Sequence, residues 1–272
     1  MIAPYYHSDR VTLYNADCID VMRDMPDNSV DAIITDLPYG TTACKWDAII
    51  PFEPMWAQVK RVLKANGAFI TTASQPFTSK LIMSNLDWFK YEWIWEKTNP
   101  SNIALANKQP MKYHENICVF YGSQPTYNKQ MVIRKSRRIK WAQDNNYKFH
   151  NSRSQQTGLK YIEVDSKKYN TEFKNPSTVL KVNSLRPNSK EFVEHPTQKP
   201  VALMEYLINT YTNESDTVLD FCMGSGSTGV AAMKLNRRFI GIELSEEYCE
   251  IAKARIHAAE LKAEADLFKP KG

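Results

Sequence analysis

Two short segments of the chain carry residue types that could do chemistry, and the first is Asp36-Leu37-Pro38-Tyr39. It follows directly on the apolar run 30–35, so a carboxylate, a rigid turn and an aromatic ring stand where a predicted strand ends. Open α/β sheets bind ligands at the carboxyl ends of their strands, and a residue before proline favours extended backbone. The segment is therefore a candidate site. The alternative is a loop in which Asp36 caps a turn and Tyr39 packs on its neighbours.

The second segment is a glycine-rich turn between a predicted strand and a predicted helix. It runs from Asp220 to Gly229 and contains Gly224 and Gly226. Glycines let the backbone come close to a ligand, and the N–H groups at the start of a helix favour negative charge. Glu243 ends the next predicted strand, where a carboxylate can accept both hydroxyls of an adenosine ribose. The pattern predicts a site for an adenosine-containing cofactor. The alternative is a tight turn beside an unrelated acid.

Strands and helices alternate on both sides of these segments. Apolar runs predict seven strands, at residues 11–14, 30–35, 67–72, 91–95, 116–121, 217–220 and 239–243. Helical spacing predicts helices at 54–64, with Asn66-Gly67 as the stop, and at 201–208, 228–235 and 246–265. This alternation implies an α/β, doubly wound, Rossmann-like fold with a mostly parallel seven-stranded sheet. Because the strands that complete the sheet precede the glycine turn, we expect a circularly permuted order.

The composition argues against several classes of protein. With 272 residues, 43% hydrophobic and 24% charged, the chain is typical of a globular enzyme and not of a disordered or fibrous protein. The five cysteines form no C-x-x-C pair and the histidines show no metal-ligand spacing, so we expect free thiols and no metal site. No signal-like apolar core begins the sequence and no run approaches the ~18 apolar residues of a membrane span, which predicts a cytoplasmic protein.

One segment supplies the excess of positive charge. The whole chain has a net charge of +5, whereas residues 122–194 hold 15 Lys and Arg against 6 Asp and Glu. Aromatic and amide side chains lie among these cations, without strong helical or strand periodicity. Cations neutralise phosphates and aromatic rings contact bases, so the segment predicts a nucleic-acid surface; the alternative is a solvated loop insertion. Its densest basic run contributes Arg134, Lys135, Arg137, Arg138 and Lys140 as candidate DNA-binding residues.

Three motifs resemble those of the amino-group DNA methyltransferases. The segment 36–39 is similar to their Asp-Pro-Pro-Tyr signature, Phe221-x-x-Gly224-x-Gly226 to their S-adenosylmethionine motif, and His195-Pro196-Thr197-Gln198-Lys199-Pro200 to the segment that precedes the helix before the cofactor strand. Their order resembles the beta group of this family. The resemblance implies a catalytic domain formed by residues 1–121 and 195–272, a target-recognition insertion at 122–194, S-adenosylmethionine as cofactor and double-stranded DNA as substrate.

The resemblance also implies a role for each candidate residue. The catalytic residues would be Asp36, Leu37, Pro38 and Tyr39. The cofactor pocket would contain Asp17, Cys18, Thr197, Lys199, Asp220, Phe221, Gly224, Gly226, Ser227, Thr228 and Glu243. Of these, Asp17, Cys18 and Phe221 would lie at the adenine. Thr197 and Lys199 would face the methionine carboxylate, and Asp220 the methionine amine. Leu37 stands where the family usually has a proline. Leucine keeps the backbone carbonyl group, but its φ is not fixed by a ring.

The chemistry expected at Asp36 follows from the electronic structure of the target. The exocyclic amine of adenine or cytosine is a poor nucleophile because its lone pair is delocalised into the ring. If the Asp36 carboxylate and the Leu37 carbonyl accept its hydrogens, the lone pair is directed at the sulfonium methyl and the developing positive charge is stabilised. Transfer is then direct and in-line, on a base flipped out of the duplex onto Tyr39. This requires Asp36 and the glycine turn to share one crevice.

The sequence leaves several alternatives open. We predict adenine N6 as the target because the cytosine enzymes of this group more often carry serine where Asp36 stands. N4-cytosine methylation is the alternative within the class, and a catalytically silent DNA-binding module on a methyltransferase fold is the alternative outside it. RNA or protein-amide methylation is a third. Dimers are common in the family, but the sequence decides neither the oligomeric state, nor the recognition sequence, nor whether a cognate restriction endonuclease exists.

Overall fold

The computed structural model describes residues 2–41, 47–133, 148–150, 163–165, 172–189, 191–193 and 197–267. The chain divides into two compact units, one formed by Met1–Asn128 with Thr178–Gly272 and the other by Lys129–Ser177. The second unit lies within the predicted insertion at 122–194 but is narrower, because residues on both sides of it belong to the first unit.

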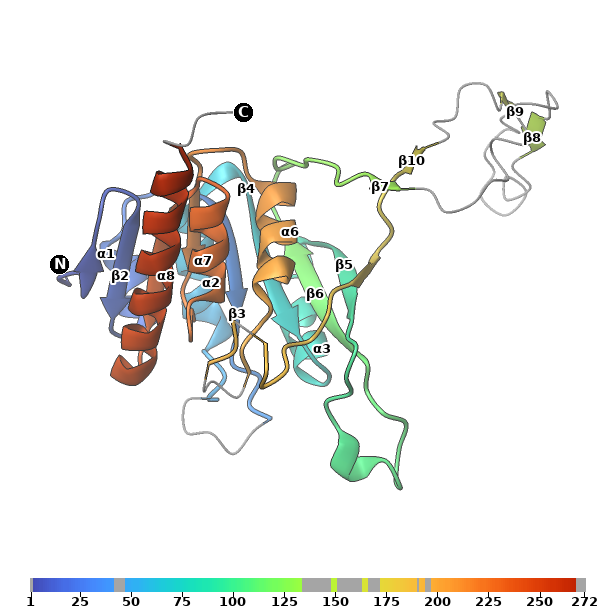
Figure 1. Cartoon of the computed structure of the whole chain (residues 1–272), viewed down its shortest axis with the longest axis horizontal. Coiled ribbons are helices and arrows are strands. Elements are labelled where there is room, and N and C mark those ends of the chain that lie inside the picture. The colour runs from blue at the N-terminus through green and yellow to red at the C-terminus, as the bar shows by residue number, and fades with distance from the viewer. Residues whose placement is uncertain are drawn as a thin grey trace. The chain divides into compact units, whose positions relative to one another are not determined.

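The first unit is built on one mostly parallel sheet (Figure 1). In spatial order its strands are β1 (Tyr6–His7), β2 (Val11–Asn15), β13 (Arg238–Glu243), β12 (Thr217–Asp220), β3 (Val30–Asp36), β4 (Leu63–Ala73), β6 (His114–Phe120), β5 (Phe89–Glu96) and β11 (Val179–Lys181). All seven predicted strands are present. The sheet has nine strands and not seven because β1 and β11 add one short strand at each edge, with two and three residues that are too few to show a periodic pattern.

The order of the strands confirms the predicted permutation. The late strands β12 and β13 lie between the early strands β2 and β3, and all four run parallel. β4 continues the parallel arrangement beside β3, whereas β6 runs antiparallel to both β4 and β5. The carboxyl ends of β3, β4, β12 and β13 therefore meet at one edge of the sheet, and β6 begins at that same edge.

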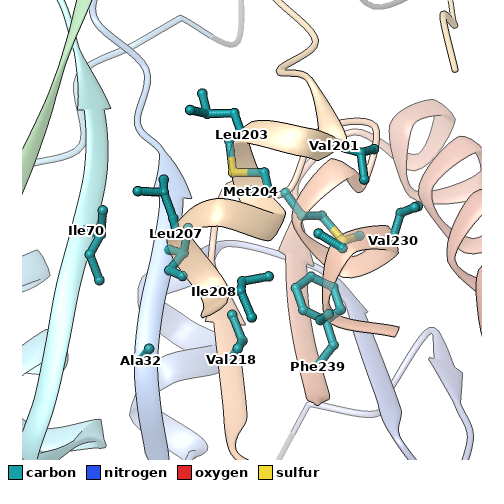
Figure 2. Close-up of a cluster of buried hydrophobic side chains, with 14 of the residues drawn as sticks. Ala32, Ile70, Val201, Leu203, Met204, Leu207, Ile208, Val218, Val230 and Phe239 are labelled. Atoms are coloured by element: carbon teal, nitrogen blue, oxygen red, sulfur yellow. The ribbon is translucent and has the colours of Figure 1, made fainter. Parts of the chain in front are cut away.

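Helices cover both faces of the sheet (Figure 1). One face carries α6 (Val201–Tyr211), α7 (Ser227–Lys234) and α8 (Glu246–Leu267). The other carries α1 (Cys18–Asp24), α2 (Phe52–Val62) and α3 (Phe77–Ser84). In Figure 2, Leu207 and Ile208 of α6 lie close to Ala32 and Val218 of the central strands. Each large apolar side chain buried in this way contributes roughly 1.5–3 kcal/mol, so the two cores hold the sheet edge in place.

The predicted end of the helix at 54–64 is wrong. α2 ends at Val62, and Leu63 already has extended backbone and begins β4. The apolar residues of α2 do follow helical spacing, with Met55, Val59 and Val62 buried. Gly67 is not a helix stop: a Cβ at this position would come within 2.7 Å of the Asp31 carbonyl oxygen. The glycine therefore allows close approach of β3 and β4, which the sequence pattern did not distinguish from a helix cap.

Among its described residues, the second unit shows two short antiparallel pairs of strands. β7 (Val132–Ile133) pairs with β10 (Phe173–Lys174), and β8 (Lys148–His150) pairs with β9 (Glu163–Asp165). The predicted DNA-binding residues of the run 134–140 lie outside the described residues. In the part of the chain that the structure describes, no helix is both long and apolar enough to cross a membrane.

Candidate active site

One cavity of about 370 Å³ opens where the carboxyl ends of the parallel strands meet. The catalytic and cofactor candidates that line it are Asp17, Cys18, Asp36, Leu37, Pro38, Tyr39, Thr197, Lys199, Phe221, Gly224 and Glu243. The structure thus brings Asp36 and the glycine turn to one crevice, although nearly two hundred residues separate them in the chain. β3 and β12 are paired neighbours, which accounts for the proximity.

The glycine-turn side of this cavity is held by backbone hydrogen bonds to a carboxylate. Glu243 Oε2 accepts from the Gly224 N–H at 2.9 Å, and Oε1 accepts from the Ser245 N–H at 2.9 Å. Burial raises the pKa of Glu243, against the opposing effect of these N–H donors. Gly224 has a φ of +48°, a left-handed conformation that suits glycine. Asp17 also lines this cavity and caps α1 by accepting from the Ile19 N–H at 2.8 Å.

A smaller cavity of about 30 Å³ is lined in part by the same residues. It is bounded by Asp36, Thr197, Lys199, Gly224 and, deeper in the protein, by Asp220, Ser227 and Thr228. Asp220 is buried, and its Oδ1 accepts from Thr35 Oγ1 at 2.7 Å and from the Cys222 N–H at 3.2 Å. Burial raises the pKa of Asp220 to about 6, although these donors oppose the shift. The buried carboxyl group therefore keeps its proton to a higher pH than an exposed aspartic acid does.

Two of the predicted cofactor residues have mainly structural contacts. Gly226, with a φ of +78°, lines neither cavity, and a Cβ there would come within 2.9 Å of the Ala252 Cβ in α8. It is required by helix packing. Phe221 borders the larger cavity, but it is 1% exposed and its ring stacks on Phe69 with the centroids 6.1 Å apart. A ligand ring would meet only the remaining edge or face of Phe221.

Asp36 accepts hydrogen bonds from three side chains. Its Oδ1 accepts from the Tyr39 hydroxyl at 2.8 Å and from the Thr72 hydroxyl, and its Oδ2 accepts from Lys199 Nζ at 2.5 Å. The Tyr39 ring stacks on Phe77 with the centroids 5.3 Å apart. Burial and the charge of Asp36 raise the pKa of Tyr39, so the phenol keeps its proton and remains a donor. Asp36 is thus a preorganised carboxylate at the cavity wall.

Lys199 pairs with carboxylates of the protein itself. Its ammonium group contacts Asp36 and lies 3.6 Å from Glu115 Oε2. Its expected contact with the methionine carboxylate of a cofactor stays a prediction. Burial lowers the pKa of Lys199, but the Asp36 and Glu115 carboxylates outweigh this effect and the net pKa is raised. Lys199 is therefore a charged, buried partner of the two carboxylates.

Several residues of the site were not found by the sequence analysis. Thr72 pairs with Asp36 in the register of β3 and β4, and Glu115 is the second residue of β6. Glu115 Oε1 accepts from Lys97 Nζ at 2.9 Å. A usable signal did exist for Thr72, because it ends the predicted strand beside the one that Asp36 follows. Lys97 and Glu115 could be placed only after the antiparallel pairing of β5 and β6 was known.

Comparisons of the sequence and the structure with known proteins find DNA methyltransferases. Residues 30–254 match the DNA methylase family. The Type II methyltransferase M2.MboI of Moraxella bovis is 28% identical over 94% of this chain and 92% of its own length. The DNA adenine methyltransferase YhdJ of Escherichia coli K12 is 28% identical over 98% of this chain and 89% of its own length. The crystal structure of the M1.HpyAVI-SAM complex matches with a TM-score of 0.59 and 28% identity, over 90% of this chain and 99% of that chain.

Proposed function

The chain belongs to the DNA methylase family, and we propose that it transfers a methyl group from S-adenosylmethionine to the N6 amine of a flipped adenine in double-stranded DNA. The observation that carries the proposal is that the Asp36 carboxylate and the Gly224–Glu243 contact border one cavity. The acceptor for the target amine and the pocket for the cofactor's adenosine therefore border the same cavity, so a bound cofactor and a flipped base can meet there.

The residues around the cavities fit S-adenosylmethionine. Glu243 stands at a strand end where a carboxylate can accept ribose hydroxyls, and Gly224 leaves the turn without a side chain. Asp220 offers a carboxyl group to an ammonium in the small cavity, beside the buried hydroxyl groups of Ser227 and Thr228. When bound, the cofactor supplies a methyl group on a sulfonium sulfur; the S–C bond breaks as the N–C bond forms, and the amine loses one proton.

The protein's own groups then act on the target amine. The Asp36 carboxylate accepts one amine hydrogen and stabilises the positive charge that develops on the nitrogen, and it or water takes the proton that is lost. The Leu37 carbonyl is the second acceptor for the amine hydrogens. The Leu37 side chain is buried in the core, which holds this turn in place. Tyr39 keeps Asp36 oriented through its hydroxyl and offers its ring to the flipped base.

Adenine is the better-supported target base. Asp36 stands where cytosine enzymes of the group more often have serine, and the E. coli relative is named a DNA adenine methyltransferase. The test is incubation of the purified protein with mixed-sequence duplex DNA and methyl-labelled cofactor, followed by digestion to nucleosides. We expect labelled N6-methyladenine nucleoside, with Asp36→Ala as the inactive control. Label found only in N4-methylcytosine would reassign the base, and DNA binding without any label would favour the silent binding module.

We also propose that the basic run 134–140 contacts DNA phosphates. Its support is the charge of the segment 122–194, in which cations exceed anions by nine. Replacement of Arg134, Lys135, Arg137, Arg138 and Lys140 by glutamine should flatten the dependence of duplex affinity on salt, by up to about 0.9 in the log–log slope for each lost phosphate contact. An unchanged slope would show that this run does not touch the DNA backbone.

The setting of the enzyme is part of the proposal. We propose that it acts in the cytoplasm, and that its methylation protects a recognition sequence from a cognate restriction endonuclease. The Type II names of relatives such as M2.MboI support the last point. Because dimers are common in the family that the chain resembles, we also propose a homodimer. Sedimentation of the full chain tests the dimer. Sequencing of methylated sites in DNA from expressing cells, followed by digestion with endonucleases of the same specificity, tests the protection.

A further inference from the structure

Lys199 lies between two carboxylates that each use only one oxygen for other contacts. At Asp36, Oδ1 accepts from Tyr39 and Thr72, and Oδ2 accepts from Lys199. At Glu115, Oε1 accepts from Lys97 at 2.9 Å, and Oε2 lies 3.6 Å from Lys199 Nζ. The two oxygens not held elsewhere therefore face the same ammonium group.

Glu115 Oε2 differs from the other carboxylate oxygens of this cluster in its hydrogen bonding. It is buried and accepts no hydrogen bond from the residues that the structure describes. A buried carboxylate oxygen without a donor costs free energy, so an arrangement that leaves one so close to an ammonium group indicates a second position for that group. Lys97 fixes the other oxygen of Glu115 and lies 5.7 Å from the centre of the Trp95 ring, which keeps the acceptor in place.

The first position of Lys199 is unfavourable for the proposed reaction. Asp36 must accept a hydrogen from the target amine while positive charge develops on that nitrogen, but in this structure the Lys199 ammonium lies on Oδ2, the Asp36 oxygen with a single donor. Only 9% of Lys199 is exposed, so its ammonium group cannot simply turn to solvent. Displacement without a new partner would leave a buried unpaired charge, which typically costs several kcal/mol.

We propose that Glu115 is a positioning residue that receives the Lys199 ammonium when the target amine binds Asp36. This inference rests on the proposed function. A shift of the ammonium from Asp36 Oδ2 to Glu115 Oε2 keeps every charge of the cluster paired and frees one oxygen of Asp36 for the base. Lys97 and Lys199 lower the pKa of Glu115 against the opposing effect of burial, so Glu115 holds the negative charge that this step needs.

Glu115→Gln tests the proposal because it keeps the shape of the side chain and removes the charge. With a weaker second acceptor, Lys199 stays on Asp36, and we expect kcat/KM for DNA to fall about 30-fold. The Kd for S-adenosylmethionine, measured without DNA, should change less than about twofold, and Glu115→Asp should recover part of the loss. The matched control is Glu96→Gln, which breaks a strand-borne glutamate–lysine pair on β5, 2.8 Å to Lys181, and should leave kcat/KM unchanged.

A double variant separates the transfer of Lys199 from a general structural role. In a Lys199→Met background no ammonium remains for Glu115 to receive, so the further change Glu115→Gln should cost less than about twofold. Equal losses in both backgrounds, or an unchanged kcat/KM in Glu115→Gln alone, would overturn the proposal. Failure of the unaltered protein to methylate DNA would instead count against the proposed function.

A crystal structure of the full chain with target duplex and a non-reactive cofactor analogue gives a readout independent of rates. We expect Lys199 Nζ about 3 Å from Glu115 Oε2, and the flipped base on Asp36 Oδ2. Lys199 still bonded to Asp36 in the presence of the flipped base would contradict the inference.

Discussion

The carboxylates on the two sides of the crevice, Glu243 on the glycine-turn side and Asp36 on the other, accept hydrogen bonds from different kinds of donor. Around Gly224 and Glu243, a carboxylate accepts from backbone N–H groups that lie at most nineteen residues away in the chain. Around Asp36, every donor given by the structure is a side chain, from residues 39, 72 and 199. The first side is thus formed within one strand–turn–helix–strand segment, and the second only by the complete fold.

This difference has an energetic consequence. Backbone donors move little when a side chain is replaced, so a change on the glycine-turn side should act mainly on cofactor affinity. The Asp36 side is a cluster of two carboxylates and two ammonium groups, in which loss of one member removes an ion-pair partner from its neighbours. Substitutions in this cluster should therefore lower the rate of methyl transfer. Where the substituted residue is buried, they should also disturb the ion pairs of its neighbours. Four predictions test this division.

The largest effect is expected for Asp36→Ala. Loss of the amine acceptor should lower kcat about 10³-fold, because the charge that develops on the nitrogen is no longer stabilised. Lys199 keeps Glu115 as a partner, so the fold should persist. The Kd for S-adenosylmethionine, measured by calorimetry, should stay within about threefold of the unaltered value. A Kd that rises as steeply as kcat falls would erase the distinction between the two sides.

The next effect concerns Asp220, which lies where the two sides meet. Its pKa of about 6 exceeds the usual value of 3.8 because of burial. The folded protein therefore binds the proton more tightly than the unfolded chain, so this contribution to stability is fully present below about pH 4 and is lost as the pH rises through 6. The loss should reach about 3 kcal/mol, since one pKa unit corresponds to about 1.4 kcal/mol.

Unfolding in denaturant at pH 4 and pH 7 measures this, with Asp220→Asn as the comparison. The stability of the variant relative to the unaltered protein should rise by up to about 3 kcal/mol from the lower to the higher pH. If the ionised form serves a cofactor ammonium, the same substitution should weaken cofactor binding more at pH 8 than at pH 5. A stability difference independent of pH would mean that Asp220 does not titrate in this range.

Much of the fold could be predicted because the signals are local. The seven longer strands show as apolar runs, and α6, α7 and α8 begin at or within one residue of the predicted positions. The end of α2 could not be predicted in this way, because Gly67 is set by its approach to Asp31, a tertiary contact. The short helix α3 has no side-chain cap, and α1 has seven residues, so neither gave a sufficient pattern.

The same distinction applies to the site. Gly224 and Glu243 belong to a pattern that can be read along the chain, because the turn and the next strand are close in sequence. Thr72, Lys97 and Glu115 are ordinary polar residues whose meaning depends on which strands become neighbours. Lys199 was found by motif, but its partners were not, since they lie more than eighty residues away.

Glu243→Ala sharpens the comparison from the glycine-turn side. It removes the proposed acceptor of the ribose hydroxyls and the partner of two backbone N–H groups. We expect the Kd for S-adenosylmethionine to rise about 30-fold, in line with about 2 kcal/mol for hydrogen bonds to a charged group. At saturating cofactor, kcat should remain within about threefold of the unaltered value. A kcat that stays low under saturation would show that Glu243 also serves the Asp36 side.

Thr72→Val is expected to give the smallest effect and tests how far the Asp36 side depends on orientation. The substitution keeps the shape of a buried residue and deletes the hydroxyl that donates to Asp36 Oδ1. Tyr39 still donates to the same oxygen, so Asp36 loses one of two constraints there, and kcat should fall about tenfold with the cofactor Kd unchanged. Thr71→Val is the matched control: Thr71 is equally buried on the same strand, but its hydroxyl donates to the Thr72 carbonyl. Comparable losses in the two variants would mean that packing of β4, and not the hydrogen bond to Asp36, sets the rate.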